Sequence, residues 1–428
     1  MSDTERAETR APRGQGPDDT APSRFASGDP NAPEPIVYRV WLKEGRERSL
    51  ERRHPWVYSG AVERIEALPD SAPGGLGEVV SARGEWLATA IIQPDATLVA
   101  RALRFERGPI DGEWMRARVA QAKALRAAVV PPETDAYRLV NAEGDGLPGL
   151  IVDRYAQFLV VQALSAGMVR LARLWLPALA EAESPRGIVS RGDAQGRAHG
   201  AGSGDAVLRG EAPPARLVIR EHGLRFAADL LAGQKTGFYL DQRENRRIIG
   251  ALSRGRRMLN AFAYTNAFGV YAAAGGAASV VAVETSVSAN ELARENWALN
   301  GFEDERLRIV KEDAQRVLRQ AGERYDLIVL DPPPFAKERG QVERAARAYK
   351  DLNLHALRCL APGGLLATFS CSQHIEPELF QKIVFGASLD ARVPAQWIAR
   401  CGAGPDHPVH LDHPQGEYLK GLLLRAMA

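Results

Sequence analysis

Cysteine is scarce in this sequence, and neither sign of charge is in clear excess. The only cysteines among the 428 residues are Cys359, Cys371 and Cys401. They are too few for a disulfide framework in a chain of this size, so they indicate a reducing compartment. The 55 basic and 53 acidic residues leave a formal net charge of +2, so no charged tail marks a nucleic-acid partner. The hydrophobic content of 45% and charged content of 25% are ordinary for a soluble globular protein of two or three domains.

Long apolar segments are also lacking. The first thirty-odd residues contain no apolar core that would mark a signal peptide. A long uncharged stretch, 258–283, is interrupted by polar residues and glycines such as Asn260, Thr265 and Gly269. It therefore predicts strand, loop, buried helix and strand, and excludes a membrane span. We expect a cytoplasmic protein with no membrane partner.

Composition divides the chain into four parts. Residues 1–35 are rich in Pro, Gly, Asp, Ser and Arg and predict a disordered tail. The alternative is a weak RNA-contacting arm, but acids alternate with its bases Arg6, Arg10, Arg13 and Arg24. Residues 36–107 then show short aromatic and β-branched runs typical of a small β-barrel. Bases beside aromatics in that module, at Arg52 and Arg53, could bind phosphate, or they could form an ordinary charged rim.

Residues 108–220 predict a central α+β domain. Helical spacing covers Trp114–Val130 and about Val169–Glu183, and apolar runs at Leu150–Asp153 and Phe158–Gln162 predict paired strands. Residues 184–216 read as a long surface loop with one short strand. The acidic loop around Glu143 and Asp145 offers only two carboxylates, so we expect no metal site.

Residues 221–428 predict an α/β domain. Apolar runs at Met258–Phe262, Ser279–Val283, Leu307–Lys311, Tyr325–Leu330 and Gly364–Phe369 alternate with helical segments, which is typical of a doubly wound parallel sheet. The acids or thiol that follow successive strands are then placed at one edge of the sheet. These residues are Glu284, Asp313, Asp331 and Cys371.

The segment Asp331-Pro332-Pro333-Pro334-Phe335 ends the fourth of these strands. Consecutive prolines cannot continue a strand, so the chain turns out of the sheet. The carboxylate of Asp331 is then left where open α/β folds bind ligands. Such a loop suits a planar base, because the acid accepts from ring or exocyclic N–H groups and Phe335 offers a stacking face. The alternative is a stiff turn at a strand end.

The acids at the second and third strand ends indicate the cofactor. Glu284 can hold both hydroxyls of a ribose, and Asp313 can meet an adenine amine. The turn between Ala263 and Gly269 is not a phosphate-cradling Gly-x-Gly-x-x-Gly, and no Walker lysine is present. A cofactor with ribose and adenine but no phosphate is S-adenosylmethionine, so the residues predict a methyltransferase.

From about Ile36 to its end, the chain resembles the bacterial family of 23S ribosomal RNA cytosine-C5 methyltransferases of the large-subunit methyltransferase I type. The resemblance implies an N-terminal PUA-like β-barrel, a central α+β domain and a class I methyltransferase domain that acts on ribosomal RNA of the large subunit. The stretches that carry it are 138–154, 233–246, 259–271, 331–335, 349–353, 369–372, 406–408 and 417–421.

The resemblance also implies roles for individual residues. Besides Glu284, Asp313 and Asp331, the cofactor contacts would be Gln234, Thr236, Phe262, Tyr264, Thr265, Ser286 and Pro332. The RNA contacts would be Arg52, Arg53, Lys235, Arg243, Phe335 and Lys420. The chain departs from the family's pattern twice, with Asn266-Ala267 at a Gly-Gly pair and Pro334 at a Lys. The first departure predicts weaker cofactor binding, because side chains now stand where the backbone approaches the ligand.

The covalent mechanism is a hypothesis built on Cys371 and this resemblance. A thiolate that adds at C6 of cytosine makes C5 nucleophilic enough to attack the methyl sulfonium, and Asp331 would hold or protonate N3. The target nucleotide must be unstacked or flipped to be reached. The sequence does not identify the base that removes the C5 proton. Cys359 and Cys401 read as structural, and His407 as a loop histidine satisfied by Asp406, in preference to one that faces RNA.

Alternatives stay open at this point. Cys371 could be a small buried residue of no catalytic role. The enzyme could methylate a base amine by gripping it with Asp331-Pro332-Pro333, or the protein could be a non-catalytic RNA-binding or assembly factor whose cofactor site has decayed. The sequence also leaves a homodimer open.

Overall fold

The computed structural model describes residues 28–192, 206–231, 233, 235–320, 322–336 and 338–427. The expected tail up to residue 27, with its four arginines, lies outside the described residues. The last residues of the expected tail, which the structure does describe, contact the central part of the chain. The buried carboxylate of Glu34 pairs there with Arg170 at 2.5 Å and with Arg173 at 2.7 Å. Among the described residues, no helix combines the length and the apolar character that crossing a membrane requires.

The N-terminal part is a six-stranded sheet with the order β2-β6-β5-β4-β1-β3. Its strand β1 pairs in parallel with β4 and antiparallel with β3, and Val40, Val79 and Ala90 lie in its core. The elements are β1 (Ile36–Leu42), α1 (Arg48–Glu51), β2 (Trp56–Tyr58), η1 (Ser59–Ala61), β3 (Val62–Ala67), β4 (Leu76–Val80), β5 (Trp86–Ile92) and β6 (Leu98–Arg104).

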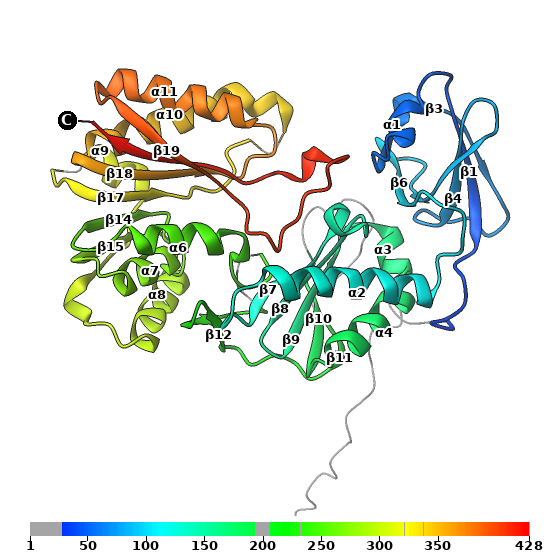
Figure 1. Ribbon diagram of the computed structural model, residues 1–428, viewed down its shortest axis with the longest axis horizontal. Coiled ribbons are helices and arrows are strands. Elements are labelled where there is room, and N and C mark those ends of the chain that lie inside the picture. Colours follow the sequence, from blue (N-terminus) through cyan, green and yellow to red (C-terminus); the bar gives the residue numbers. More distant parts are fainter. Residues whose placement is uncertain are drawn as a thin grey trace, which may run out of the picture.

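The central part is a five-stranded sheet, ordered β11-β10-β9-β8-β7, whose face is covered by helices α2 and α4 (Figure 1). The segment 184–216, expected to hold one strand, contributes two, β10 and β11. The elements are α2 (Gly112–Val129), β7 (Ala136–Asn141), η2 (Ala142–Asp145), β8 (Leu150–Tyr155), β9 (Phe158–Ala163), α3 (Ala166–Arg170), α4 (Ala172–Glu183), β10 (Gly187–Ser190) and β11 (Ala206–Gly210); the hairpin of β12 (Leu217–Glu221) and β13 (Leu224–Ala228) follows.

The C-terminal part is a seven-stranded sheet with the order β16-β15-β14-β17-β18-β20-β19. Strands β14 to β18 pair in parallel, and β20 is antiparallel to both of its neighbours. The strands are β14 (Arg257–Ala261), β15 (Ser279–Val283), β16 (Leu307–Val310), β17 (Tyr325–Leu330), β18 (Leu360–Ser370), β19 (Ala395–Gly402) and β20 (Lys420–Ala426). The predicted doubly wound parallel sheet is thus confirmed.

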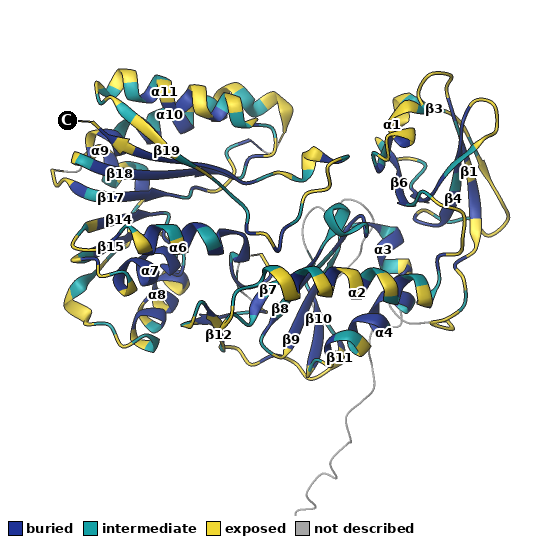
Figure 2. Cartoon of the chain, viewed as in Figure 1, coloured by how far each residue is buried: buried dark blue, intermediate teal, exposed yellow. Residues whose placement is uncertain are grey.

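Helices cover both faces of this sheet, as the buried strands in Figure 2 show. Along β17, Leu327 and Val329 pack in one apolar core while Ile328 and Leu330 pack in the other, which is why the strand is apolar at every position from Leu327 to Leu330. The helices are α6 (Arg243–Ala251), α7 (Ala267–Ala274), α8 (Val287–Leu299), α9 (Ala314–Gln320), α10 (Val342–Arg358) and α11 (Pro377–Ala391), with short turns η3 (Leu240–Gln242), η4 (Asp304–Arg306), η5 (Arg339–Gln341) and η6 (Pro414–Gly416).

The strand order decides where a ligand fits. From β14 the chain proceeds outward to β15 and β16 on one side, and then returns to β17 and β18 on the other. Open α/β sheets bind ligands at this switch point, outside the carboxyl ends of the strands. The segments there are the loop after Ala261, which ends β14, and the loop after Leu330, which ends β17.

Candidate active site

The loop after β14 is anchored by Glu284 at the end of β15. One carboxylate oxygen of Glu284 accepts a hydrogen bond from the backbone N–H of Tyr264 at 3.0 Å, and the other accepts from Ser286 N–H at 2.8 Å. The acid therefore ties together the first two loops of the sheet edge and remains half-buried. An acid in this position has lone pairs left for the hydroxyls of a ribose.

The same loop is conformationally strained. Phe262, Tyr264 and Asn266 all adopt left-handed backbone angles, with φ of 60°, 48° and 58°. Each such non-glycine residue costs about 1 kcal/mol or more, and strain of this kind gathers at ligand-binding sites. Thr265 lies between two of these residues, is 1% exposed, and has a hydroxyl without a hydrogen-bond partner in the described structure.

The side chain of Asn266 is turned into the protein. It is fully buried, its Oδ1 accepts from Asn260 Nδ2 at 2.9 Å, and it fills the space above Gly269, where an added Cβ would lie 2.1 Å from Oδ1. The amide is thus folded back over the first turn of α7. The weaker cofactor binding expected from Asn266-Ala267 stays a prediction.

Asp331 and Cys371 lie together at the ends of β17 and β18. The Cys371 Sγ atom is 4.0 Å from the carbonyl oxygen of Pro332, and both Asp331 and Cys371 are half-buried. Burial, and then the facing carboxylate of Asp241, raises the pKa of Asp331 to about 7. Burial, and then the charge of Asp331, raises the pKa of the Cys371 thiol to about 11. The two groups are therefore electrostatically coupled.

Asp241 is the third acidic or thiol group of the site. Its Oδ2 accepts from Lys235 Nζ at 2.6 Å and from the Tyr418 hydroxyl at 2.5 Å, while its Oδ1 is buried without a partner in the described structure. Burial alone would raise the pKa of Asp241, but Lys235 and His407 hold it well below its usual range. Asp241 is therefore the ionised neighbour that keeps a proton on Asp331.

The proline loop is held rigidly against α10. The Ser372 hydroxyl accepts from the backbone N–H of Ala336 at 3.2 Å and bonds the Tyr349 hydroxyl at 3.0 Å. The ring centroid of Phe335 is 4.6 Å from that of Tyr349. This packing fixes the direction in which Asp331 and Cys371 face.

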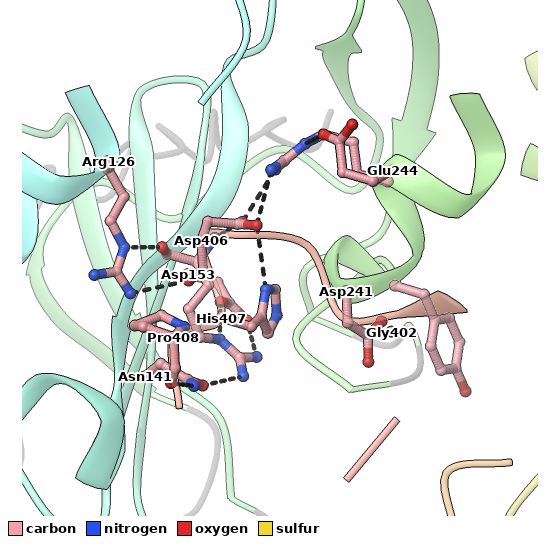
Figure 3. Close-up of polar contacts among 12 residues, drawn as sticks. Arg126, Asn141, Asp153, Asp241, Glu244, Gly402, Asp406, His407 and Pro408 are labelled. Carbon is pink, nitrogen blue, oxygen red and sulfur yellow. Dashed lines mark hydrogen bonds and ion pairs between the residues drawn. The ribbon is translucent and has the colours of Figure 1, made fainter. Parts of the chain in front are cut away.

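A second polar cluster joins the site to the central sheet (Figure 3). The carboxylate of Asp406 accepts two hydrogen bonds from Arg243, at 2.8 and 3.0 Å, and one from Arg138 N–H at 3.0 Å. Its carbonyl oxygen accepts from Arg126 at 2.9 Å. Burial alone would raise the pKa of Asp406, but His407 and Arg243 hold it well below its usual range. The loop between β19 and β20 therefore bonds to residues of both the central part and the C-terminal part of the chain.

The structure separates the expected RNA contacts into exposed and buried residues. Arg52 and Arg53 are exposed at the end of α1, and Arg53 pairs with Glu106 at 2.7 Å. Lys235 is exposed beside Asp241. Two other expected RNA contacts, Arg243 and Lys420, are buried and do not face solvent. The Arg243 side chain is 0% exposed and pairs with Asp406. Lys420 is 5% exposed, and its Nζ atom donates to the carbonyl oxygen of Ser372 at 2.8 Å.

The remaining expected cofactor contacts are spread along the same edge. Asp313 is exposed, and its Oδ1 accepts from Arg316 N–H at the start of α9. Ser286 caps α8 by accepting from Ala289 N–H. Thr236 is buried with its hydroxyl bonded to Asp153 at 2.6 Å. Pro332 is buried. Gln234 lies outside the described residues.

Sequence reasoning missed Asp241 and Tyr418 as members of the site, and no local signal marks them. Asp241 lies in the short turn η3, directly before α6. Tyr418 comes from a segment 177 residues further along the chain. His407 was expected to be satisfied by Asp406. It is buried, with Nδ1 3.3 Å from Asp406 Oδ1, although neither ring nitrogen makes a hydrogen bond in the described structure.

Among the described residues, no group of three or more His, Cys, Asp or Glu is arranged to hold a metal ion.

Comparisons with known proteins agree with this architecture. A family profile described as S-adenosylmethionine-dependent methyltransferase matches residues 178–423, and one described as PUA-like domain matches residues 40–105. The fold class expected from the sequence is confirmed, and S-adenosylmethionine is the cofactor. The division of the chain at residues 107 and 220 stays a prediction.

Two curated relatives cover almost the whole chain. Ribosomal RNA large subunit methyltransferase I of Shewanella denitrificans is 41% identical over 396 residues, which is 91% of this chain and 100% of that protein. The protein of the same name from Tolumonas auensis is 42% identical over 395 residues, 91% of this chain and 99% of its own.

Solved structures share the fold. A candidate S-adenosylmethionine-dependent methyltransferase from Streptococcus mutans superposes with a TM-score of 0.77 at 21% identity, covering 90% of this chain and 99% of its own. A second candidate methyltransferase, crystallised with SAH (S-adenosylhomocysteine), gives a TM-score of 0.78 at 22% identity with the same coverage.

Proposed function

The chain belongs to the ribosomal RNA large subunit methyltransferase I family, and we propose that it methylates C5 of a cytosine in 23S ribosomal RNA through a covalent bond to Cys371. The observation that carries this proposal is that the Cys371 Sγ atom lies 4.0 Å from the carbonyl oxygen of Pro332, the residue after Asp331, so that the thiol and the acid are neighbours at the sheet edge. A thiol beside an acid of pKa about 7 suits addition to a pyrimidine, which needs a nucleophile and a proton donor together. A base-amine transfer has no use for the thiol.

The residues at the sheet edge fit the cofactor. Glu284 would hold the ribose, the loop of Phe262, Tyr264 and Thr265 would line the nucleoside, and Asp313 would lie near the adenine. The buried, inward-turned side chain of Asn266 supports a working cofactor site. When bound, S-adenosylmethionine supplies an electrophilic methyl group.

The roles of the protein's own groups follow from their charges. The Cys371 thiol first releases its proton to solvent. The thiolate then uses an electron pair to form the S–C6 bond, and the displaced π electrons leave C5 electron-rich while N3 takes the proton of Asp331. At neutral pH about half of the Asp331 carboxyls carry that proton, since the pKa is about 7. After C5 has gained the methyl group and lost its proton to a base, the S–C6 bond breaks, Cys371 leaves as a thiolate, and Asp331 recovers its proton from N3.

The RNA must present an unstacked cytosine to this edge. Arg52 and Arg53, which follow α1 in the N-terminal part, and Lys235 beside the site supply cationic contacts for phosphates. Phe335 is half-buried against Tyr349 and would offer only part of its face to a base. We propose a cytoplasmic location, where ribosomal RNA is found.

Methyl transfer from labelled S-adenosylmethionine to 23S ribosomal RNA tests the proposal, with naked RNA and with ribosomal subunits as substrates. The RNA is then digested and its nucleosides are analysed for the wild type and Cys371→Ala. We expect label in 5-methylcytidine with the wild type and none with the variant. The matched control is Cys401→Ala, which removes a thiol of similarly raised pKa outside the site and should keep activity.

Label in a methylated base amine, or full activity of Cys371→Ala, would contradict the covalent mechanism and favour the amine methyltransferase. No label in any nucleoside, together with no detectable binding of SAH, would favour a non-catalytic RNA-binding protein.

A further inference from the structure

We propose that Lys420 is a positioning residue whose buried ammonium group stabilises the thiolate of Cys371. This inference rests on the proposed function, because it assigns the cation that the proposed nucleophile needs. It also replaces the expectation that Lys420 contacts RNA.

The sheet brings Lys420 to the nucleophile. Strand β20 pairs antiparallel with β18 so that Lys420 is opposite Ser370, the residue before Cys371. The Lys420 Nζ atom donates to the carbonyl oxygen of Ser372, the residue after Cys371, at 2.8 Å. The ammonium group is therefore fixed against the peptide segment that carries the thiol, and it interacts with Cys371 electrostatically.

This lysine is unusual because it is buried without an ion-pair partner. Lys420 is 5% exposed, and among the described residues no carboxylate lies within ion-pair distance of its Nζ atom. The carboxylates of Glu376 and Glu417 act on it only from further away. Burial lowers the pKa of this ammonium group because an unpaired buried charge is costly, and a thiolate at Cys371 offsets that cost.

The other groups around Cys371 make a free cation necessary. The carboxylates of Asp331 and Asp241 disfavour the thiolate, whereas the ammonium group of Lys235 favours it. The second cation, Lys235, is bonded to Asp241 at 2.6 Å, which neutralises much of its effect. Lys420 therefore supplies the positive charge that no neighbouring carboxylate cancels at close range.

The test separates the charge of Lys420 from its hydrogen bond. Lys420→Gln keeps a donor for Ser372 O but carries no charge, whereas Lys420→Arg keeps the charge. The rate at which iodoacetamide alkylates Cys371 is measured between pH 6 and 10 and assigned to Cys371 by peptide mass spectrometry. Lys382→Met, which removes an exposed lysine on α11, is the matched control.

We expect the alkylation profile of Lys420→Gln to move to higher pH by about one pKa unit, so that the rate near pH 8 falls roughly tenfold. Lys420→Arg should restore most of the rate, and Lys382→Met should leave it unchanged. In methyl transfer, Lys420→Gln should lower kcat and leave the KM for S-adenosylmethionine unchanged. An alkylation profile of Lys420→Gln equal to that of the wild type would overturn the inference.

Alkylation requires no methyl transfer, so its result does not depend on the reaction proposed above. If Cys371→Ala retains activity, the proposed function fails while the alkylation result still decides whether Lys420 controls the thiol. Binding of SAH by Lys420→Gln verifies that the variant is folded. If that variant does not fold, the Lys420→Met profile gives the same answer for the charge.

Discussion

Replacing Asp331 by Asn should abolish methyl transfer and at the same time stabilise the protein at alkaline pH. The carboxyl group has a pKa of about 7 in the folded protein, against 3.8 ordinarily. Its ionised form is therefore disfavoured by folding, because it is desolvated and faces the ionised Asp241. An amide at this position keeps the shape of the side chain and removes the charge.

The magnitude follows from linkage. Each pKa unit is worth about 1.4 kcal/mol, so the rise from 3.8 to about 7 corresponds to an upper limit of roughly 4 kcal/mol. Because the pKa of Asp331 is higher in the folded protein, ionisation of this carboxyl group lowers the free energy of unfolding. This loss of stability is absent below pH 4, grows as the pH rises from 4 to 7, and is complete above pH 7. We expect Asp331→Asn to be more stable by about 2–4 kcal/mol at pH 8.5 and by no more than about 1 kcal/mol at pH 4.5.

Thermal unfolding of both proteins at these two pH values measures the effect. For a domain of this size, 3 kcal/mol corresponds to a rise of roughly 6–12 °C in Tm. Asp304→Asn, which changes an exposed acid of η4, should show no such pH-dependent difference. An Asp331→Asn variant that is destabilised at pH 8.5, or that differs from the wild type equally at both pH values, would refute the reasoning.

Three further predictions concern the surrounding network. Arg243→Met leaves the buried carboxylate of Asp406 without its main partner, so unfolding in urea should show a loss of about 3–5 kcal/mol, while the exposed Arg247→Met should lose little. The pKa of Asp406 is lower in the folded protein than its ordinary value, so the ionised carboxylate stabilises the fold above the ordinary pKa and this stabilisation is lost as the pH falls toward the folded value. Asp406→Asn should therefore have a lower free energy of unfolding than the wild type at pH 7, and the difference should shrink on acidification. A difference that does not change with pH would contradict the lowered pKa. Asn266→Gly should change the affinity for SAH by less than about threefold in calorimetry, because the Asn side chain points away from the ligand, and a tenfold change would mean that it contacts the ligand.

Local patterns were sufficient for the sheet and its edge. The run Tyr325–Leu330 is apolar at every position but one, and Asp331 with its prolines can only end such a strand. Strand bounds at Ser279–Val283 and Tyr325–Leu330 agree with the structure. Because parallel strands bring their carboxyl ends to one edge, the sequence by itself determined that Glu284, Asp331 and Cys371 lie at the same edge of the sheet.

What surrounds those residues was decided only by tertiary structure. Asp241 meets Tyr418 across 177 residues of chain, and Arg243 meets Asp406 across 163, and no local periodicity encodes such pairs. The sequence therefore cannot tell a lysine or arginine that faces RNA from one buried beside a thiol or a carboxylate. Burial also turns Asn266 inward and shifts the pKa of Asp331. The identity of the reactive groups lies in the sequence, but their ionisation depends on desolvation and on charges that only the folded chain brings together.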